Sequence, residues 1–257
     1  MPAQSPDPLR DLLLACELHD ARRLGSVLDA GLDPIAQVGG KTPVTWLLEM
    51  YTRSDRFTEC LRVLLDRGAV VGDALLSAVL LDEPEAIRAA APVDGARALG
   101  QRVSLPSAFT PLEGASLLHV AAEFGHVRSA EVLLELGVPA DARAAIDRDG
   151  LGGHTALFHT VNSNANRAVP VMHLLLDAGA DPQLLVPGLT WGRGFDWEST
   201  FFDLTPLAYA QLGLLPQMHR DPRHIDANVR ALLAAAGRPV PVMANVPNRY
   251  VARAAQL

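Results

Sequence analysis

The sequence predicts an all-α fold in which short helix-turn-helix units stack into a solenoid. Two short phrases recur along the 257 residues, one typical of a helix start and the other of a helix end. Similar numbers of residues separate these phrases in different parts of the chain. Such a pattern indicates one structural unit that is used several times.

The predicted helix ends share large apolar residues followed by glycine. The apolar residues would face the core in the last helical turn, and glycine can adopt the left-handed conformation that satisfies the terminal carbonyl groups. The phrase occurs at residues 27–31, 64–68, 133–137 and 174–179, with a looser copy at Leu232-Leu233 before Gly237.

The predicted helix starts share a hydroxyl residue followed by an apolar residue, which is proline in two cases. A hydroxyl group can cap the free backbone amides, and proline in the first helical position loses no hydrogen bond. These starts are Thr42, Ser116, Thr155 and Thr205. We therefore expect a helix to begin directly after each of them.

One segment carries both phrases and identifies a family. Ser116 to Gly137 reads SLLHVAAEFGHVRSAEVLLELG, which resembles an ankyrin repeat, a thirty-three-residue unit with the pattern T-P-L-H-x-A-A-x-x-G-H and an L-L-x-x-G ending. The resemblance implies that His119 is a structural histidine bonded to nearby backbone. It also implies that His126 belongs to the Gly-His turn between two helices.

The spacing of the terminal glycines predicts how many units there are. Gly31 to Gly68 is 37 positions and Gly137 to Gly179 is 42, whereas Gly68 to Gly137 is 69. Because the last interval is close to two units, we expect a degenerate unit within residues 73–91. The resemblance then covers about six units.

We expect a single ankyrin-repeat domain over residues 1–238. Its units lie near residues 9–34, 40–70, 72–95, 114–140, 153–182 and 203–238, with insertions near Asn162–Asn166 and Leu214–His224. Residues 239–257 are expected to form an extended tail that caps the stack through Val240, Val242, Val246 and Tyr250.

Residues 184–202 are expected to be a long insertion, an arm or hairpin in the finger between the fifth and sixth units. Leu189 to Phe202 holds five of the thirteen aromatic residues of the chain. Aromatic residues and arginine occupy odd positions from 191, whereas glycine and acidic residues occupy even positions through 198. A period of two predicts a strand with one aromatic face.

Three interpretations of this insertion are open. The aromatic face could pack on its own stack as core. Trp191 and Trp197 could instead remain exposed as anchors for a partner. Asp196 and Glu198 could also form a catalytic pair of carboxyl groups.

Composition disfavours several classes of protein. Acidic residues number 29 against 22 basic ones, and a net charge of -7 argues against a nucleic-acid partner. The N-terminus lacks a signal-peptide pattern and no apolar run is long enough to span a membrane. Two cysteines in apolar contexts fit a reducing cytoplasm. Lys41 is the only lysine, a skew that suggests a bacterial source.

Motifs for cofactor or metal binding are incomplete. Gly40-Lys41-Thr42 lacks the earlier glycine of a phosphate-binding loop, because Ile35 stands at that position. The eight histidines include no H-E-x-x-H arrangement. We therefore expect no cofactor, no metal and no small-molecule substrate.

The resemblance implies a non-enzymatic scaffold that recognises another protein. The candidate contact residues are Lys41, Arg148, Asp149, Trp191, Arg193, Phe195, Trp197, Glu198 and Tyr209. One alternative is an acidic inhibitor or immunity-type protein that covers a basic protein such as a nuclease. The other is a hydrolase that uses Asp196 and Glu198.

Overall fold

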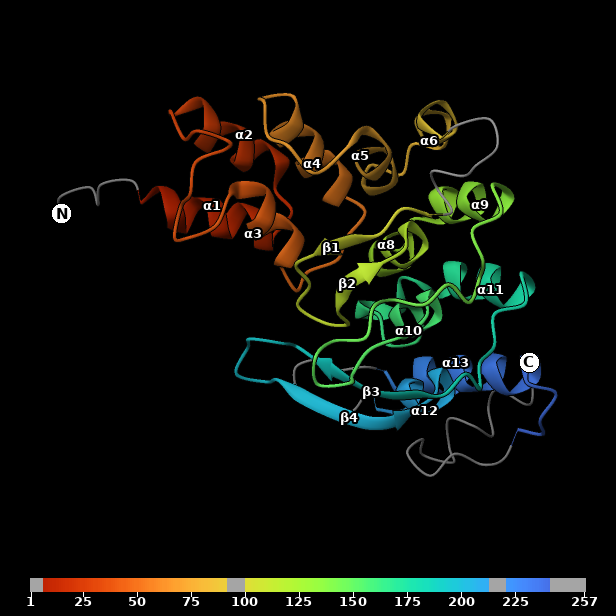
Figure 1. Ribbon diagram of the computed structural model, residues 1–257. Coiled ribbons are helices and arrows are strands. Elements are labelled where there is room, and N and C mark those ends of the chain that lie inside the picture. Colours follow the sequence, from red (N-terminus) through yellow and green to blue (C-terminus); the bar gives the residue numbers. More distant parts are fainter. Residues whose placement is uncertain (1–6, 92–99, 213–220, 241–257) are drawn as a thin grey trace.

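The computed structural model describes residues 7–91, 100–212 and 221–240, and its helices follow one another in contacting pairs (Figure 1). The pairs are α1 (Pro8–Glu17) with α2 (Ala21–Asp29), α3 (Pro43–Glu49) with α4 (Phe57–Leu65), α5 (Ala74–Leu80) with α6 (Pro84–Ala90), α8 (Leu117–Phe124) with α9 (Val127–Glu135), α10 (Ala156–Val161) with α11 (Val169–Asp177), and α12 (Pro206–Gln211) with α13 (Pro222–Ala235). A short 3-10 turn, Asn164–Asn166, separates α10 from α11.

Local capping explains where several of these helices begin. Thr42, Ser116, Thr155 and Thr205 each precede a helix, which confirms the four predicted starts. The Thr205 hydroxyl accepts a hydrogen bond from the amide of Ala208 at 3.1 Å. At Ser116 the cap is reciprocal, because the Ser116 amide donates to Nδ1 of His119 at 3.2 Å.

The prediction of an all-α fold is wrong. The structure is mixed, with 48% helix and 11% strand, and the strands form two small antiparallel sheets. The first pairs β1 (Val103–Leu105) with β2 (Leu112–Ala115), and the second pairs β3 (Val186–Trp191) with β4 (Ser199–Leu204). Backbone groups in the segments between helix pairs satisfy one another across strands, which helical periodicity alone does not reveal.

The predicted strand through residues 191–198 is also corrected. β3 ends at Trp191 and β4 begins at Ser199, so the alternating residues between them form the turn of the hairpin. Gly192 has φ +65°, and a side chain there would collide with Trp197, which folds back over it. The insertion is therefore a hairpin, one of the two forms expected, and residues 192–198 are its turn and not a strand.

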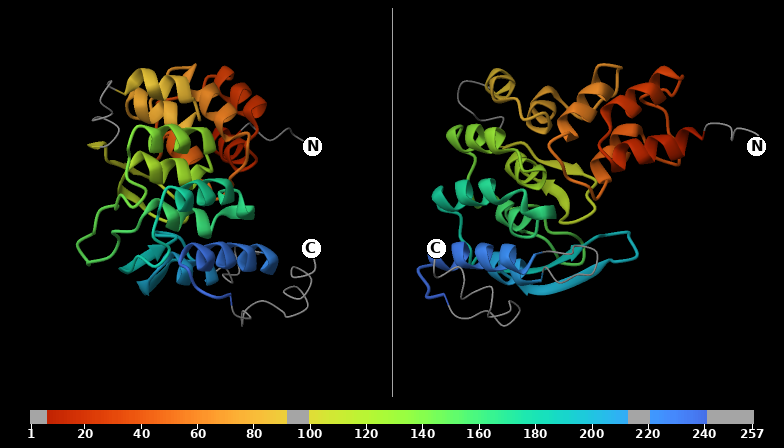
Figure 2. Two further views of the ribbon diagram at one scale, coloured as in Figure 1. Left: turned by 90° about the vertical axis from the view of Figure 1, so that its right-hand side faces the viewer. Right: turned by 180° about the vertical axis from the view of Figure 1, so that it is seen from behind.

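The helix pairs stack from α1 and α2 at one end to α12 and α13 at the other (Figures 1 and 2). The third pair is short, with seven residues in each helix. Beside it, residues of the second and fourth pairs meet directly: the rings of Phe57 and Phe124 lie 4.5 Å apart. The buried core therefore continues from the N-terminal pairs into the later ones.

A buried polar network lies at this junction. Nη2 of Arg53 donates to Oε1 of Glu123 at 2.9 Å, and Nδ1 of His159 donates to Oε2 of the same carboxylate at 2.9 Å. All three residues are buried. Burial by itself would raise the pKa of Glu123, but hydrogen bonds and charge from His159 and Arg53 outweigh it and lower that pKa. We call this set the shoulder network.

Other predicted features have plain outcomes. His119 donates from Nε2 to the carbonyl of His154 at 3.0 Å, as the resemblance implied. Cys16 and Cys60 are free and buried in the core. Residues 241–257 and 213–220, which include most of the predicted tail and much of the predicted insertion near Leu214–His224, lie outside the described residues.

Candidate functional site

Backbone hydrogen bonds join the segments between successive helix pairs, which we call fingers, into one surface. The amide of Ala145 donates to the carbonyl of Glu113 in β2 at 3.2 Å, and the amide of Gly152 donates to the carbonyl of Gly188 in β3 at 2.8 Å. A side chain at Gly152 would collide with the Ala145 carbonyl at 2.4 Å. Glycine is therefore required where these backbones cross.

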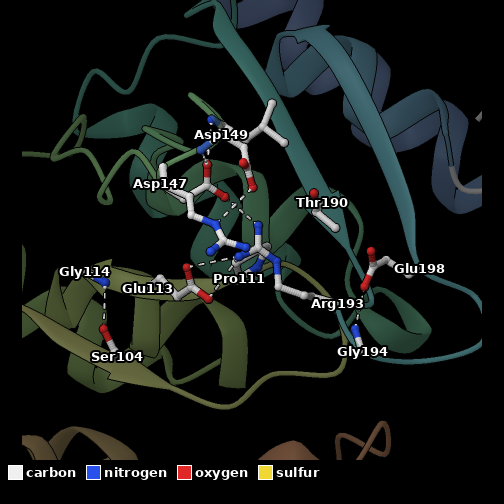
Figure 3. A network of polar contacts seen from close by, with 12 residues as sticks. Ser104, Pro111, Glu113, Gly114, Asp147, Asp149, Thr190, Arg193, Gly194 and Glu198 are labelled. Atoms are coloured by element: carbon white, nitrogen blue, oxygen red, sulfur yellow. Dashed lines mark hydrogen bonds and ion pairs between the residues drawn. The ribbon is translucent and has the colours of Figure 1, made fainter.

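Arg193 lies at the centre of this surface, in the turn between β3 and β4. Its guanidinium donates to Asp147 at 2.6 Å and approaches Glu113 at 3.5 Å (Figure 3). The carboxylate of Asp147 also accepts from the amides of Asp149 and Leu151, at 2.9 and 3.0 Å. One arginine thus ties together three segments that are far apart in the sequence.

These contacts stabilise the charged forms of both partners. The hydrogen bond from Arg193, together with the backbone amides, lowers the pKa of Asp147. The same hydrogen bond raises the pKa of Arg193. Because the Arg193 side chain remains 40% exposed, water screens the pair and its contribution to stability is small.

A groove of about 810 Å³ opens beside Arg193. Four carboxylates and two guanidinium groups line it, with an apolar portion formed by Leu151 and the exposed ring of Phe202. Its lining residues are Glu113, Asp147, Arg148, Asp149, Leu151, Thr190, Arg193, Glu198, Thr200 and Phe202. We call it the finger groove.

The finger groove brings together four of the nine candidate contact residues. Arg148, Asp149, Arg193 and Glu198 line it, although they come from two different segments. The carboxylate of Glu198 accepts a hydrogen bond from the amide of Gly194 at 2.7 Å, which fixes the turn (Figure 3).

The remaining candidates lie elsewhere. Trp191 and Tyr209 are fully buried at 0% exposure, so they are core residues and offer no contact surface. Phe195 and Trp197 stack on each other at 4.5 Å and are half-buried at the end of the hairpin. Lys41 forms an ion pair with Glu49 near α3 and does not line the groove.

Sequence reasoning missed the residues that complete the groove. Glu113 and Asp147 were not candidates, although each lies in a segment directly before a predicted helix start. Phe202 was counted among the aromatic residues of the insertion but was not a candidate contact residue, and it is 67% exposed. Strand alternation around position 202 would have placed it on the face opposite Phe201, but only the register of β4 against β3 shows which face packs on the core.

The two carboxylates proposed for hydrolysis do not share a strand face. Asp196 is exposed in the turn, and Glu198 is bonded to the backbone of that turn. Within the described residues, no group of three or more histidine, cysteine, aspartate or glutamate residues could hold a metal ion. No described helix is both long and apolar enough to cross a membrane.

A comparison with protein-family profiles identifies one segment of the chain. Residues 113–146 match the profile of the ankyrin repeat, and this segment runs from β2 through α8 and α9 to the finger beyond them. The chain therefore contains one segment that matches an ankyrin repeat. The resemblance seen in Ser116 to Gly137 is confirmed. A search of curated proteins finds no significant match to the sequence.

The matched ankyrin repeat contributes directly to the groove. It supplies Glu113 at its start and Ala145 at its end, and these residues are joined by the backbone hydrogen bond described above. Ankyrin repeats mediate interactions between proteins. The segment that matches the ankyrin repeat therefore forms part of the surface on which Arg193 lies.

Proposed function

We propose that this protein is a non-enzymatic scaffold that binds a protein partner in the finger groove. The observation that carries the proposal is the combination of an exposed aromatic ring, Phe202, with surrounding carboxylates in one groove. Aromatic side chains supply much of the binding energy at protein interfaces. Carboxylates around such an anchor select for a cationic partner.

The charge of the groove favours a basic segment as the ligand. Of the four carboxylates, Asp147 and Glu113 contact Arg193, Asp149 approaches Arg148 at 3.8 Å, and Glu198 accepts from a backbone amide. The lining therefore carries four carboxylates against two guanidinium groups. The net charge of -7 for the whole chain acts in the same direction. An acidic inhibitor that covers a basic protein, the alternative raised from composition, is one form of this function.

The hydrolase alternative has less support. A pair of catalytic carboxyl groups needs a fixed mutual geometry around a substrate, whereas Asp196 projects from an exposed turn and Glu198 braces that turn. We also propose that the six helix pairs in the described part of the chain form one ankyrin-type domain, and that the protein is cytoplasmic. The free, buried cysteines support the latter because oxidised compartments favour disulfides.

The proposal is tested by partner capture with the whole protein as bait. Capture should be compared for wild type, Phe202→Ala, and Ile35→Ala, since Ile35 is an exposed apolar residue of similar accessibility outside the groove. We expect Phe202→Ala to weaken binding of the captured protein about ten-fold or more. Ile35→Ala should bind as wild type does.

A second arm tests the charge of the partner. Binding should weaken steeply between low and physiological salt, because exposed charges are screened over about 8–10 Å. Asp149→Asn should reduce this salt dependence. Equal capture by all three baits, or binding that is insensitive to salt, would contradict the groove as the docking site.

A further inference from the structure

A second hollow, of about 330 Å³, lies at the turns between helices and shares no lining residue with the finger groove. Segments from four helix pairs form it: the start of α4, the turn between α5 and α6, the turn between α8 and α9, and the residue before Ala168 at the start of α11. Its lining residues are Ser54, Asp55, Thr58, Arg62, Leu81, Asp82, Phe124, Gly125, His126, Arg128 and Arg167. We call it the arginine hollow.

Three arginines from three helix pairs converge on this hollow. Arg62 lies on α4, Arg128 on α9, and Arg167 before α11. Nothing in the proposed partner recognition uses them. Guanidinium groups are well suited to phosphate because their fork of donors matches two phosphate oxygens.

The carboxylates near these arginines leave donors for a ligand. Arg62 pairs with Glu83 at 2.9 Å and Arg128 approaches Glu85 at 3.7 Å, while Arg167 pairs with Asp55. The Asp55 and Glu85 side chains are largely exposed, and such ion pairs contribute little in water.

Asp82, one of the two acidic residues in the lining, already accepts hydrogen bonds from the protein. The carboxylate of Asp82 accepts from the amide and the hydroxyl of Ser129, at 2.7 and 2.8 Å. It therefore caps α9 and its charge is partly neutralised by two donors. The three arginine side chains remain 30–60% exposed, and each guanidinium has more donors than its ion pair uses.

Two nine-residue helices also begin at this site. Neither α4 nor α9 has a side-chain hydrogen bond from its N-cap residue. Helix N-termini carry free amides and partial positive charge, and both attract anions. Because Asp82 already caps the start of α9, the start of α4 is the one that adds to the three arginines in favouring an anion.

His126 supplies an independent observation. It lines the hollow and is more than nine-tenths buried, yet its Nε2 has no hydrogen-bond partner among the described residues. A buried imidazole nitrogen without a partner is costly unless a ligand group satisfies it. A phosphate monoester near neutral pH can carry a hydroxyl proton that donates to such a nitrogen.

We propose that the arginine hollow binds a phosphate monoester group, held by Arg62, Arg128 and Arg167 beside the buried His126. Binding would link the second, fourth and fifth helix pairs, which supply the three arginines. A ligand that binds only the folded state raises its stability. The site is independent of partner docking in the finger groove.

The first test uses inorganic phosphate as the probe and thermal unfolding of the whole protein as the readout. We expect phosphate to raise the melting temperature in a saturable manner, above the effect of sodium chloride at the same ionic strength. Identical responses to phosphate and chloride would overturn the proposal.

Matched variants locate the effect. Arg62→Gln and Arg128→Gln should each weaken phosphate binding about ten-fold or more, since each removes charge-assisted hydrogen bonds. The control is Arg88→Gln, because Arg88 is similarly exposed and pairs with Glu135 at 2.6 Å outside the hollow. A phosphate response that survives in both hollow variants, or is lost in the control, would contradict the assignment.

A second pair of probes identifies the source of the phosphate. A short phosphoserine peptide and its unphosphorylated counterpart should be titrated by calorimetry beside inorganic phosphate. Tighter binding of the phosphopeptide than of phosphate assigns the site to a phosphorylated protein segment. Equal affinity for the phosphopeptide and for inorganic phosphate assigns the site to a free phosphate ligand. Absence of binding by the phosphopeptide and by inorganic phosphate refutes the site.

Discussion

The shoulder network and the finger groove use the same residue types with opposite consequences. In the shoulder network, the side chains of Arg53 and Glu123 are only 5% and 4% exposed. In the finger groove, Arg193 and Glu113 are 40% and 52% exposed. A buried ion pair becomes very costly when one partner is removed, whereas an exposed pair is screened by water.

The shoulder network therefore contributes to stability, whereas the finger groove is suited to recognition. Arg53 lies 4.7 Å above the ring of Phe124 and joins the second helix pair to the fourth, so its charge fixes how the stack continues. Arg193 joins fingers whose surface is open to a partner.

Acid should have the largest effect on stability, and it should act through the buried histidines. Burial is the main cause that lowers the pKa of His19 and His126 to about 4 and of His119 to about 3. Burial also lowers the pKa of His154 well below its usual value. The unfolded chain therefore binds protons first as the pH falls below about 6.5.

The sign of the effect follows from this order of protonation. Stability is fully present above pH 6.5 and falls between pH 6.5 and about 4, by up to about 1.4 kcal/mol per pH unit for each such histidine. Urea unfolding at several pH values measures it. A flat profile from pH 7.5 to 5 would show that these histidines are not buried in the neutral form.

Breaking the shoulder network should be the next largest effect. Glu123→Ala leaves Arg53 buried without a countercharge, and the expected loss is about 3–5 kcal/mol in the free energy of unfolding. Denaturant unfolding gives this value. A double variant with Arg53→Met should recover part of the loss, because no unpaired charge would remain. Failure to recover would mean that Arg53 acts mainly through packing.

The equivalent change in the finger groove should be small. Arg193→Gln is expected to cost less than about 1 kcal/mol, because the Arg193 side chain is 40% exposed and water screens its pair with Asp147. The same denaturant measurement compares it directly with Glu123→Ala. A loss similar to that of Glu123→Ala would remove the distinction between the two regions.

Tryptophan accessibility should show the smallest but most local contrast. Acrylamide should quench Trp191 least, because it is fully buried, and should quench the half-buried Trp197 more. Comparing wild type with Trp191→Phe and Trp197→Phe assigns the emission, with Trp46 as the third tryptophan. Free quenching of Trp191 would show that the hairpin opens away from the stack in solution.

The sequence predicted the helices more successfully than the strands because capping is local. Thr42 and Thr205 stand next to the helices that they start, and the Ser116 to Gly137 segment carries the full pattern of an ankyrin repeat within twenty-two residues. The alternation after Trp191 led to a wrong prediction of a strand, because a period of two cannot distinguish a strand from a turn that contains glycines.

The sequence by itself determined that helix pairs recur, where several begin and which segment is an ankyrin repeat, since each of these depends on neighbours along the chain. Tertiary structure decided that Trp191 is core, that Phe202 is exposed and that Arg193 meets Asp147 across 46 positions. It also placed Arg53 against Glu123 across 70 positions. Burial and charge pairing depend on residues brought together by stacking, and a local pattern carries no information about those distant neighbours.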